Sequence, residues 1–176
     1  MAKTKETKTN AMRLLDSAGI SYQVHEYDTD DGKIDGVSVA EKCGQDPERV
    51  FKTLVSVGSD GNHYVFVVPV REKLDLKKAA KEAGVKSIEM IPQKELLGLT
   101  GYIHGGCSPV GMKKLFATWI DETAVLFDTI CVSGGKVGLQ IELNPEQLCS
   151  LIHANMAMIT REEHLTPFFC IIGKCR

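Results

Sequence analysis

Segments of helical and of strand periodicity follow one another along the chain. The apolar residues of segment 10–18 recur at helical spacing and Gly19 follows them, which predicts a helix. The next segment, 20–27 (ISYQVHEY), alternates between apolar and polar residues as a strand does. Two further strand patterns, 50–57 and 64–70, are separated by turn-forming residues and predict a β-hairpin.

Cap and turn residues mark the remaining elements. Ser38 and Glu41 match a capping box, while Asp75 and Pro92 are typical of helix starts. Segment 100–114 has no periodicity and is expected to be a loop. The pattern predicts helices over 38–44, 76–84, 92–99 and 145–154, and strands over 87–91, 115–120, 124–132, 137–143 and 156–160.

The predicted strands come in hairpin-like pairs with helices inserted between them, and no repeat or linker interrupts the chain. This order predicts an α+β (mixed α/β) fold. We expect a single domain with a mixed, largely antiparallel sheet that tends towards a barrel with surrounding helices. A doubly wound parallel sheet would alternate strand and helix more regularly.

Composition and charge fit a soluble globular domain. The chain has 176 residues, of which 43% are hydrophobic and 25% charged, enough to bury a core without metal or disulfide support. The net charge of −2 gives no bulk attraction to nucleic acid, so any basic surface must be local. No apolar run reaches the roughly 18 residues of a membrane span, and the polar N-terminus lacks the apolar core of a secretion signal. We therefore expect a cytoplasmic protein with no membrane partner.

The six cysteines are scattered and form no close pair, which disfavours a zinc site, a redox pair or disulfides. We expect free thiols, no metal and no cofactor. No helix-turn-helix pattern is present, so a DNA partner is not expected. A solvated helix face is a better interpretation than a nucleic-acid surface for the lysines around segment 76–84: Lys73, Lys77, Lys78, Lys81 and Lys86.

Lys52 stands in the middle of an otherwise apolar strand pattern, VFKTLV. Because side chains alternate along a strand, Lys52 shares a face with Leu54, while Thr53 and Val55 share the opposite face. Lysine is rarely buried without a partner, yet a desolvated lysine is a common catalytic or anion-binding group. The pattern alone allows two interpretations: a side chain that reaches water from a partly open face, or a cation held in a pocket.

The loop at 101–114 (GYIHGGCSPVGMKK) is rich in glycine. Gly105 and Gly106 lack Cβ atoms, so their backbone N–H groups could approach a ligand and hold an oxyanion or phosphate oxygen. A connector that needs positive φ angles is an equal alternative. Cys107 and His104 lie three residues apart with no acidic residue to orient them, which makes a nucleophile–base pair a weak hypothesis.

The turn 133–136 (SGGK) joins two predicted strands. Its simplest interpretation is a Gly-Gly hairpin turn. Lys136 at the tip could contact a phosphate, and Ser133 could donate a hydrogen bond to a ligand.

Four separated motifs, taken in order, resemble the YbaK family of freestanding aminoacyl-tRNA editing domains, which are related to the insertion domain of bacterial prolyl-tRNA synthetases. The version GYxxGGxSPxGxKK with VSGGKxGL is most similar to the Cys-tRNA(Pro) deacylase branch. The resemblance spans about 9–159, implies an editing domain over 1–163 and leaves 164–176 as a tail of unassigned role. The motifs are VFKTL (50–54), LDLKKAAK (74–81), TGYIHGGCSPVGMKK (100–114) and VSGGKVGLQIEL (132–143).

The resemblance implies trans-editing: cleavage of the ester between cysteine and the 3′-terminal ribose of mischarged Cys-tRNA(Pro). It also implies substrate-assisted chemistry, in which the substrate's thiol attacks its own carbonyl and leaves as a cyclic thioester. Lys52 matches the family's essential lysine and, with Gly105 and Gly106, forms the implied catalytic group. The implied substrate-binding residues are Tyr27, Thr53, Cys107, Ser108, Pro109, Ser133, Lys136 and Gln140.

The implied partner is the 3′ acceptor end of aminoacyl-tRNA, with a prolyl-tRNA synthetase as a further candidate. Gln140 stands where relatives can carry an acidic residue, so the amino-acid preference is open. The alternatives are a deacylase for Ala or Ser on tRNA and a non-catalytic tRNA- or nucleotide-binding module. If Lys52 and Thr53 line one pocket, we expect the strand to twist or bulge between them.

Overall fold

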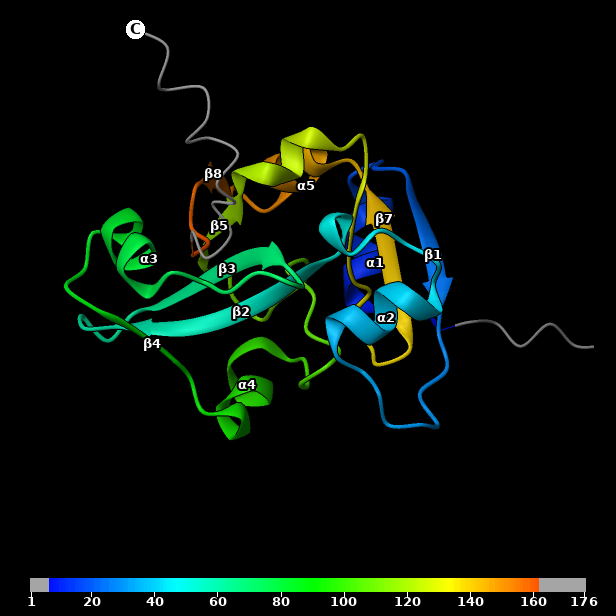
Figure 1. Cartoon of the computed structure of the whole chain (residues 1–176), viewed down its shortest axis with the longest axis horizontal. Coiled ribbons are helices and arrows are strands. Elements are labelled where there is room, and N and C mark those ends of the chain that lie inside the picture. Colours follow the sequence, from blue (N-terminus) through cyan, green and yellow to red (C-terminus); the bar gives the residue numbers. More distant parts are fainter. Residues whose placement is uncertain (1–6, 162–176) are drawn as a thin grey trace, which may run out of the picture.

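The structure, a computed structural model, describes residues 7–161. In this part of the chain two sheets and the helices around them form one mixed α/β unit (Figure 1). The predicted α+β class and the largely antiparallel strand pairing are confirmed. The strands divide into two sheets, however, and these do not close into a barrel.

The larger sheet has five strands in the order β4-β2-β3-β5-β8. Strands β2 (Phe51–Gly58) and β3 (His63–Pro69) form the predicted hairpin, and β4 (Ile88–Met90) pairs with the end of β2. Strands β5 (Ala117–Asp121) and β8 (Asn155–Ala157) extend the sheet in parallel beyond β3. Parallel neighbours need a crossover, which the chain makes between β3 and β5 through two helices.

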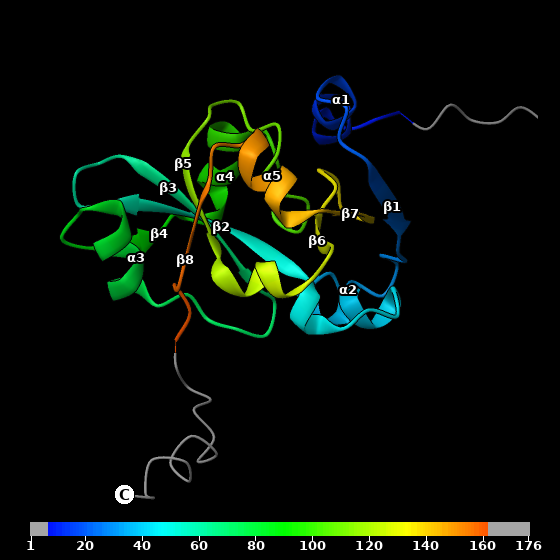
Figure 2. The same ribbon diagram turned by 90° about the horizontal axis from the view of Figure 1, so that it is seen from above.

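The smaller sheet is antiparallel, in the order β1-β7-β6. Its strands are β1 (Tyr22–Glu26), β6 (Ile130–Ser133) and β7 (Leu139–Leu143). It meets the larger sheet at one point, where a parallel bridge joins Val50 to Cys131. Figure 2 shows the smaller sheet beside the start of β2, at the opposite end of that strand from β4.

The helix α3 (Leu76–Ala83) begins and ends at the capping residues that the sequence predicts. The Asp75 carboxylate accepts hydrogen bonds from the N–H groups of Lys77 and Lys78 (3.0 Å each), and Gly84 ends that helix at φ 71°. The helices are α1 (Asn10–Ser17), α2 (Gly36–Lys42), α3 (Leu76–Ala83), α4 (Gln93–Thr100) and α5 (Pro145–Leu151), with 3-10 turns η1 (Pro47–Arg49) and η2 (Glu122–Leu126).

The predicted cap at Ser38 and the predicted strand at 124–126 are wrong, and an aspartate explains each. Asp35, not Ser38, caps α2: its carboxylate accepts from the Ser38 N–H (3.1 Å) and hydroxyl (2.7 Å), so the helix begins at Gly36. The first part of the predicted strand 124–132 is the turn η2, because the Asp121 carboxylate accepts from the N–H (3.3 Å) and hydroxyl (2.6 Å) of Thr123.

The main apolar cluster joins both sheets to α1 and α5. Leu15, Ile120, Ile141 and Leu148 are fully buried in it, each burial stabilising the fold by about 1.5–3 kcal/mol. The cluster therefore holds the two sheets together although only one backbone bridge connects them. No helix within residues 7–161 is long and apolar enough to cross a membrane. The predicted tail, 164–176, lies outside the described residues.

Candidate active site

A cavity of about 340 Å³ lies where the smaller sheet meets the first half of β2. Its size is at the lower end of the range for small-molecule sites. Segment 34–39, the loop around Gly105 and strands β6 and β7 complete its walls. The cavity brings together seven of the predicted site residues: Tyr27, Lys52, Thr53, Gly105, Cys107, Ser133 and Gln140.

Lys52 lines the cavity with a half-buried side chain. Its ammonium donates to the carbonyl of Val70 across the hairpin, at 3.4 Å. Burial lowers the pKa of Lys52 below its usual value, an effect that Glu72 opposes and Lys73 reinforces. One weak neutral acceptor leaves the ammonium with further hydrogen-bonding capacity for an anionic or carbonyl oxygen. Of the two interpretations of the sequence, the pocket lysine agrees with this placement.

Thr53 lines the same cavity as Lys52, and of the twist or bulge expected between them, no bulge is present. Strand β2 keeps a one-to-one register with β3 from Phe51 to Val57. The Val70 N–H donates to the Val50 carbonyl at 2.9 Å, so the backbone groups of Val50 point towards β3. Because this direction alternates from residue to residue in an antiparallel pair, the backbone N–H and C=O of Thr53 point away from β3. Strand β4 pairs only with 56–58, which leaves this edge of β2 open. Consecutive residues reach the cavity because it lies against a free strand edge.

Gln140 and Ser133 face the cavity from the smaller sheet, where they are directly paired. Gln140 is 2% exposed, and neither its amide oxygen nor its nitrogen has a hydrogen-bond partner among the described residues. The buried hydroxyl of Thr53 is likewise without one. Unpaired buried polar atoms cost about 1–3 kcal/mol each, so their gathering at one cavity indicates groups kept for a ligand.

The glycine loop closes one side of the cavity. Gly105 has φ 84°, and a Cβ there would lie 2.7 Å from the Ile34 Cδ1 atom. Gly106 does not line the cavity, and its N–H donates to the carbonyl of Ile103 at 3.0 Å. In this structure the Gly106 amide closes a turn, and its predicted role as an oxyanion donor stays a prediction. Gly106 also allows close packing: a Cβ would lie 2.9 Å from the Val137 nitrogen.

Three other predicted binding residues lie outside the cavity lining. Ser108 is fully buried, and its hydroxyl accepts from the Val110 N–H at 3.2 Å. Pro109 is buried beside it, and neither residue lines the cavity in this structure. Their predicted binding role stays a prediction. Lys136 is exposed on the turn between β6 and β7 and is directed to the protein surface. A phosphate outside the cavity is the contact that its position permits.

Cys107 and His104 both line the cavity, but the thiol is not activated. Burial raises the pKa of Cys107 to about 11, against which Thr100 acts weakly. A neutral thiol is a poor nucleophile at neutral pH. The cavity therefore offers a cation, backbone edge groups and unpaired polar atoms, without an activated protein nucleophile among the described residues.

Sequence reasoning missed the apolar part of the wall. Ile34, Val37 and Val39 enter from the acidic loop and α2, and Leu96 enters from α4. Single apolar residues in a loop and on short helices carry no pattern that distinguishes a cavity wall from a core. Across residues 7–161 there is no group of three or more histidine, cysteine or acidic side chains placed to hold a metal ion.

This combination defines a class: a small α/β domain with a reactant-sized cavity at the junction of two sheets. Comparison with protein families matches residues 35–151 to the aminoacyl-tRNA editing domain. The chain therefore belongs to the aminoacyl-tRNA editing domain family, and the resemblance identified from its motifs is confirmed.

Individual relatives agree with this assignment. A protein of Enterococcus faecalis named "Putative Cys-tRNA(Pro)/Cys-tRNA(Cys) deacylase EbsC" is 46% identical over 164 residues, which cover 93% of this chain and all of the relative. A proline–tRNA ligase of Shouchella clausii is 33% identical over 76 residues, 43% of this chain but 13% of the ligase. A crystal structure described as "a putative trans-editing enzyme for prolyl tRNA synthetase" superimposes with a TM-score of 0.77 at 26% identity, covering 89% of this chain and 99% of that one.

Proposed function

We propose that this protein deacylates mischarged tRNA in trans, with Cys-tRNA(Pro) as its principal substrate. One observation carries the proposal: the cavity of a tRNA-editing domain holds a half-buried lysine and unpaired polar groups, beside a thiol that burial keeps protonated. The name of the Enterococcus faecalis relative, 46% identical over its full length, supports the same substrate.

An aminoacyl ester is already activated, so positioning and charge can supply much of the acceleration. In the proposed reaction the substrate's thiol sulfur attacks its own carbonyl carbon. A C–S bond forms, the ester C–O bond breaks, and the ribose oxygen leaves with the proton that the thiol gives up. Lys52 holds the reacting carbonyl oxygen or the terminal phosphate, and the Gly105 backbone and the open edge at Thr53 position the aminoacyl group.

The cavity wall supports a preference for a small, weakly polar side chain. Most of the lining is apolar, and a serine hydroxyl would need a hydrogen-bond partner that a cysteine thiol does not. The amide oxygen of Gln140 can accept a hydrogen bond from the substrate's α-ammonium group, and the Thr53 hydroxyl can take a second contact. Tyr27 and Ser133 complete the polar part of the proposed subsite.

The rest of the substrate lies outside the cavity. The 3′ acceptor end is the proposed partner, and Lys136, exposed on the turn beside Ser133, is placed to meet a backbone phosphate. The similarity to 76 residues of a proline–tRNA ligase supports an association with a prolyl-tRNA synthetase, in the cytoplasm where aminoacyl-tRNA is made.

A deacylation panel tests the proposal. Purified protein is incubated with Cys-, Ala-, Ser- and Pro-tRNA, alongside Lys52→Ala and Cys107→Ser variants. We expect rapid loss of cysteine, slow loss of serine, no activity in Lys52→Ala and nearly full activity in Cys107→Ser. Equal deacylation rates for Cys- and Ser-tRNA would contradict thiol participation. Faster deacylation of Ala-tRNA than of Cys-tRNA would favour the alternative of an Ala-tRNA deacylase. Binding of tRNA without any deacylation would favour the non-catalytic alternative.

A further inference from the structure

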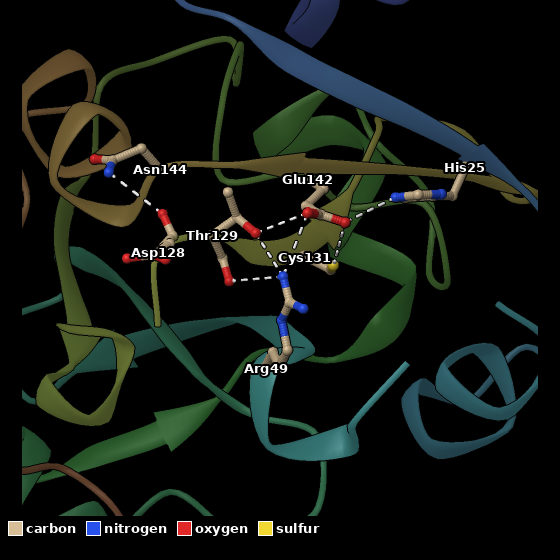
Figure 3. Close-up of polar contacts among 7 residues, drawn as sticks. All are labelled: His25, Arg49, Asp128, Thr129, Cys131, Glu142 and Asn144. Carbon is tan, nitrogen blue, oxygen red and sulfur yellow. Dashed lines mark hydrogen bonds and ion pairs between the residues drawn. The ribbon is translucent and has the colours of Figure 1, made fainter. Parts of the chain in front are cut away.

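A part-buried polar network lies beside the cavity residues of β6 and β7 and is centred on the carboxylate of Glu142 (Figure 3). His25 contacts Oε1 at 2.9 Å, and the Thr129 hydroxyl donates to Oε2 at 2.7 Å. The Cys131 thiol adds a weaker contact to Oε1 at 3.9 Å. The hydrogen bond from Thr129 has the largest effect on the pKa of Glu142 and lowers it, while burial raises it. The hydrogen bond from His25 and the positive charge of Arg49 lower it further, which favours the charged carboxylate.

Arg49 brings the opposite charge to this network from η1, the turn that leads into β2 of the larger sheet. Its Nη2 group donates to the Thr129 carbonyl (3.2 Å), to the Thr129 hydroxyl and to Glu142 Oε2 (3.3 Å). The hydroxyl of Thr129 therefore relays a hydrogen bond from the guanidinium to the carboxylate. The Arg49 and Glu142 side chains are 33% and 18% exposed, so water screens this pair less than a surface pair.

The network and the cavity occupy neighbouring rows of the same two strands. Glu142 is paired with Cys131, and two positions along β7 Gln140 is paired with Ser133. Side chains two apart share a face, so Glu142 lies next to Gln140 on the cavity side of the sheet. Arg49 ends η1, three residues before Lys52 in β2 of the larger sheet.

The Arg49–Glu142 contact thus joins the η1 turn, which leads into β2 of the larger sheet, to β7 of the smaller sheet. Lys52 reaches the cavity from one sheet and Gln140 from the other. The backbone connection between the sheets here is a single bridge, Val50 to Cys131. A side-chain clamp beside that bridge limits how far the walls can separate.

We propose that Arg49 and Glu142 are positioning residues that fix the distance between Lys52 and Gln140, and so hold the aminoacyl group in line for cleavage. This inference rests on the proposed deacylase function. A purely structural role would lower stability and leave turnover by the folded protein unchanged, and the two roles are therefore separable.

The test uses full-length Arg49→Lys and Glu142→Gln variants and the double variant. All three Arg49 contacts run through Nη2, and the lysine nitrogen, which keeps the charge, lies one bond closer to the backbone and cannot reach the same position. Glutamine keeps the shape of Glu142 without its charge. Asp16→Asn is the matched control, because it breaks the exposed Lys8–Asp16 pair away from the cavity. Ile159→Val controls for a loss of stability at a buried site outside the cavity.

Steady-state deacylation of Cys-tRNA(Pro) is measured well below each unfolding midpoint. Because a misplacement of about 1 Å can cost a hundredfold in rate, we expect kcat to fall about ten- to a hundredfold in both single variants, with KM changed less than about threefold. The double variant loses no more than the more impaired single variant. Both controls keep the wild-type kcat. Unchanged kcat in Arg49→Lys and Glu142→Gln, or losses that add in the double variant, would overturn the proposal.

A second readout does not depend on turnover. The pKa of Lys52 is measured by NMR of lysine labelled at Cε, with Lys52→Arg to assign the signal. If the clamp holds the cavity closed, Arg49→Lys admits water and moves the pKa of Lys52 upward, towards its usual value. An unchanged pKa of Lys52 in Arg49→Lys would overturn the positioning role of the Arg49–Glu142 pair. Absence of deacylation by the wild-type protein would instead overturn the proposed function, so the two failures are distinguishable.

Discussion

Lys52 combines a structural cost with a proposed catalytic role, and the two can be separated by mutation. Burial lowers the pKa of Lys52 in the folded protein, so between the folded and unfolded pKa values the unfolded chain binds more protons. Stability contributed by this residue therefore rises with pH across that interval. Lys52→Met removes the charge and should raise the free energy of unfolding at pH 7 by about 0.5–2 kcal/mol while abolishing deacylation.

Urea unfolding at a series of pH values from 7 to 10 measures this effect as the difference between wild type and Lys52→Met. We expect the difference to shrink as the pH rises. Lys33→Met, at an exposed position of the acidic loop, is the control and should give no such trend. If Lys52→Met is less stable than wild type at pH 7, the Lys52 ammonium is well solvated or well paired in the folded protein.

Gln140 is the residue at which substrate preference should change most. Gln140→Glu places a carboxylate where the amide has no partner, so the α-ammonium of a bound aminoacyl group gains a charge-assisted hydrogen bond. We expect KM for Cys-tRNA to fall about fivefold, corresponding to roughly 1 kcal/mol. Gln140→Leu should raise KM and stabilise the free protein by about 1 kcal/mol, because it removes unpaired buried polar atoms. Equal KM values for the two variants would place the ammonium elsewhere.

At the level of elements, the glycine loop gives a matched pair of substitutions. Gly105 and Gly84 both have positive φ angles, 84° and 71°, so alanine costs each about 1–2 kcal/mol of backbone strain. A Cβ at Gly105 also meets Ile34 at 2.7 Å in the cavity wall, whereas at Gly84 it meets nothing within 4 Å. Gly105→Ala should therefore lower kcat/KM at least about tenfold, and Gly84→Ala should lower stability alone. Thermal unfolding and deacylation of Cys-tRNA measure the two effects, and equal activity in both variants would contradict a role for the loop.

The sequence predicts elements well where local chemistry decides, and less well where a distant contact decides. The α3 helix follows from Asp75 and Gly84, which act within a few residues. The free edge of β2 cannot be predicted from local sequence, because it depends on how far β4, some thirty residues later in the chain, pairs along β2. That edge explains how Lys52 and Thr53 share a cavity, so the motifs identified the residues but not the geometry that joins them.

At the scale of the whole molecule, the cavity depends on two separate sheets that meet at one backbone bridge rather than on one barrel. The pairing of β6 with β7 and the bridge from Val50 to Cys131 bring residues from both halves of the chain to one place. Hydrophobic patterning predicts which strands exist, but it carries no information on which sheet each strand joins. The Arg49–Glu142 pair has no signal in the sequence for the same reason, because its partners are 93 residues apart.

The buried clusters and the cavity set the smallest chain that should function. Every residue of the four apolar clusters lies between Ala11 and Ile159, and every cavity residue between Tyr27 and Gln140. A chain of residues 1–163 should therefore fold with a midpoint of thermal unfolding within about 4 °C of the full chain, a change of roughly 1 kcal/mol or less for a domain of this size. Its deacylation of Cys-tRNA should equal that of the full chain in kcat and KM. A truncation ending at Ala154, which removes β8 and Ile159, serves as the comparison and should lose stability markedly. If the 1–163 chain unfolds or loses turnover, residues 164–176 belong to the functional domain.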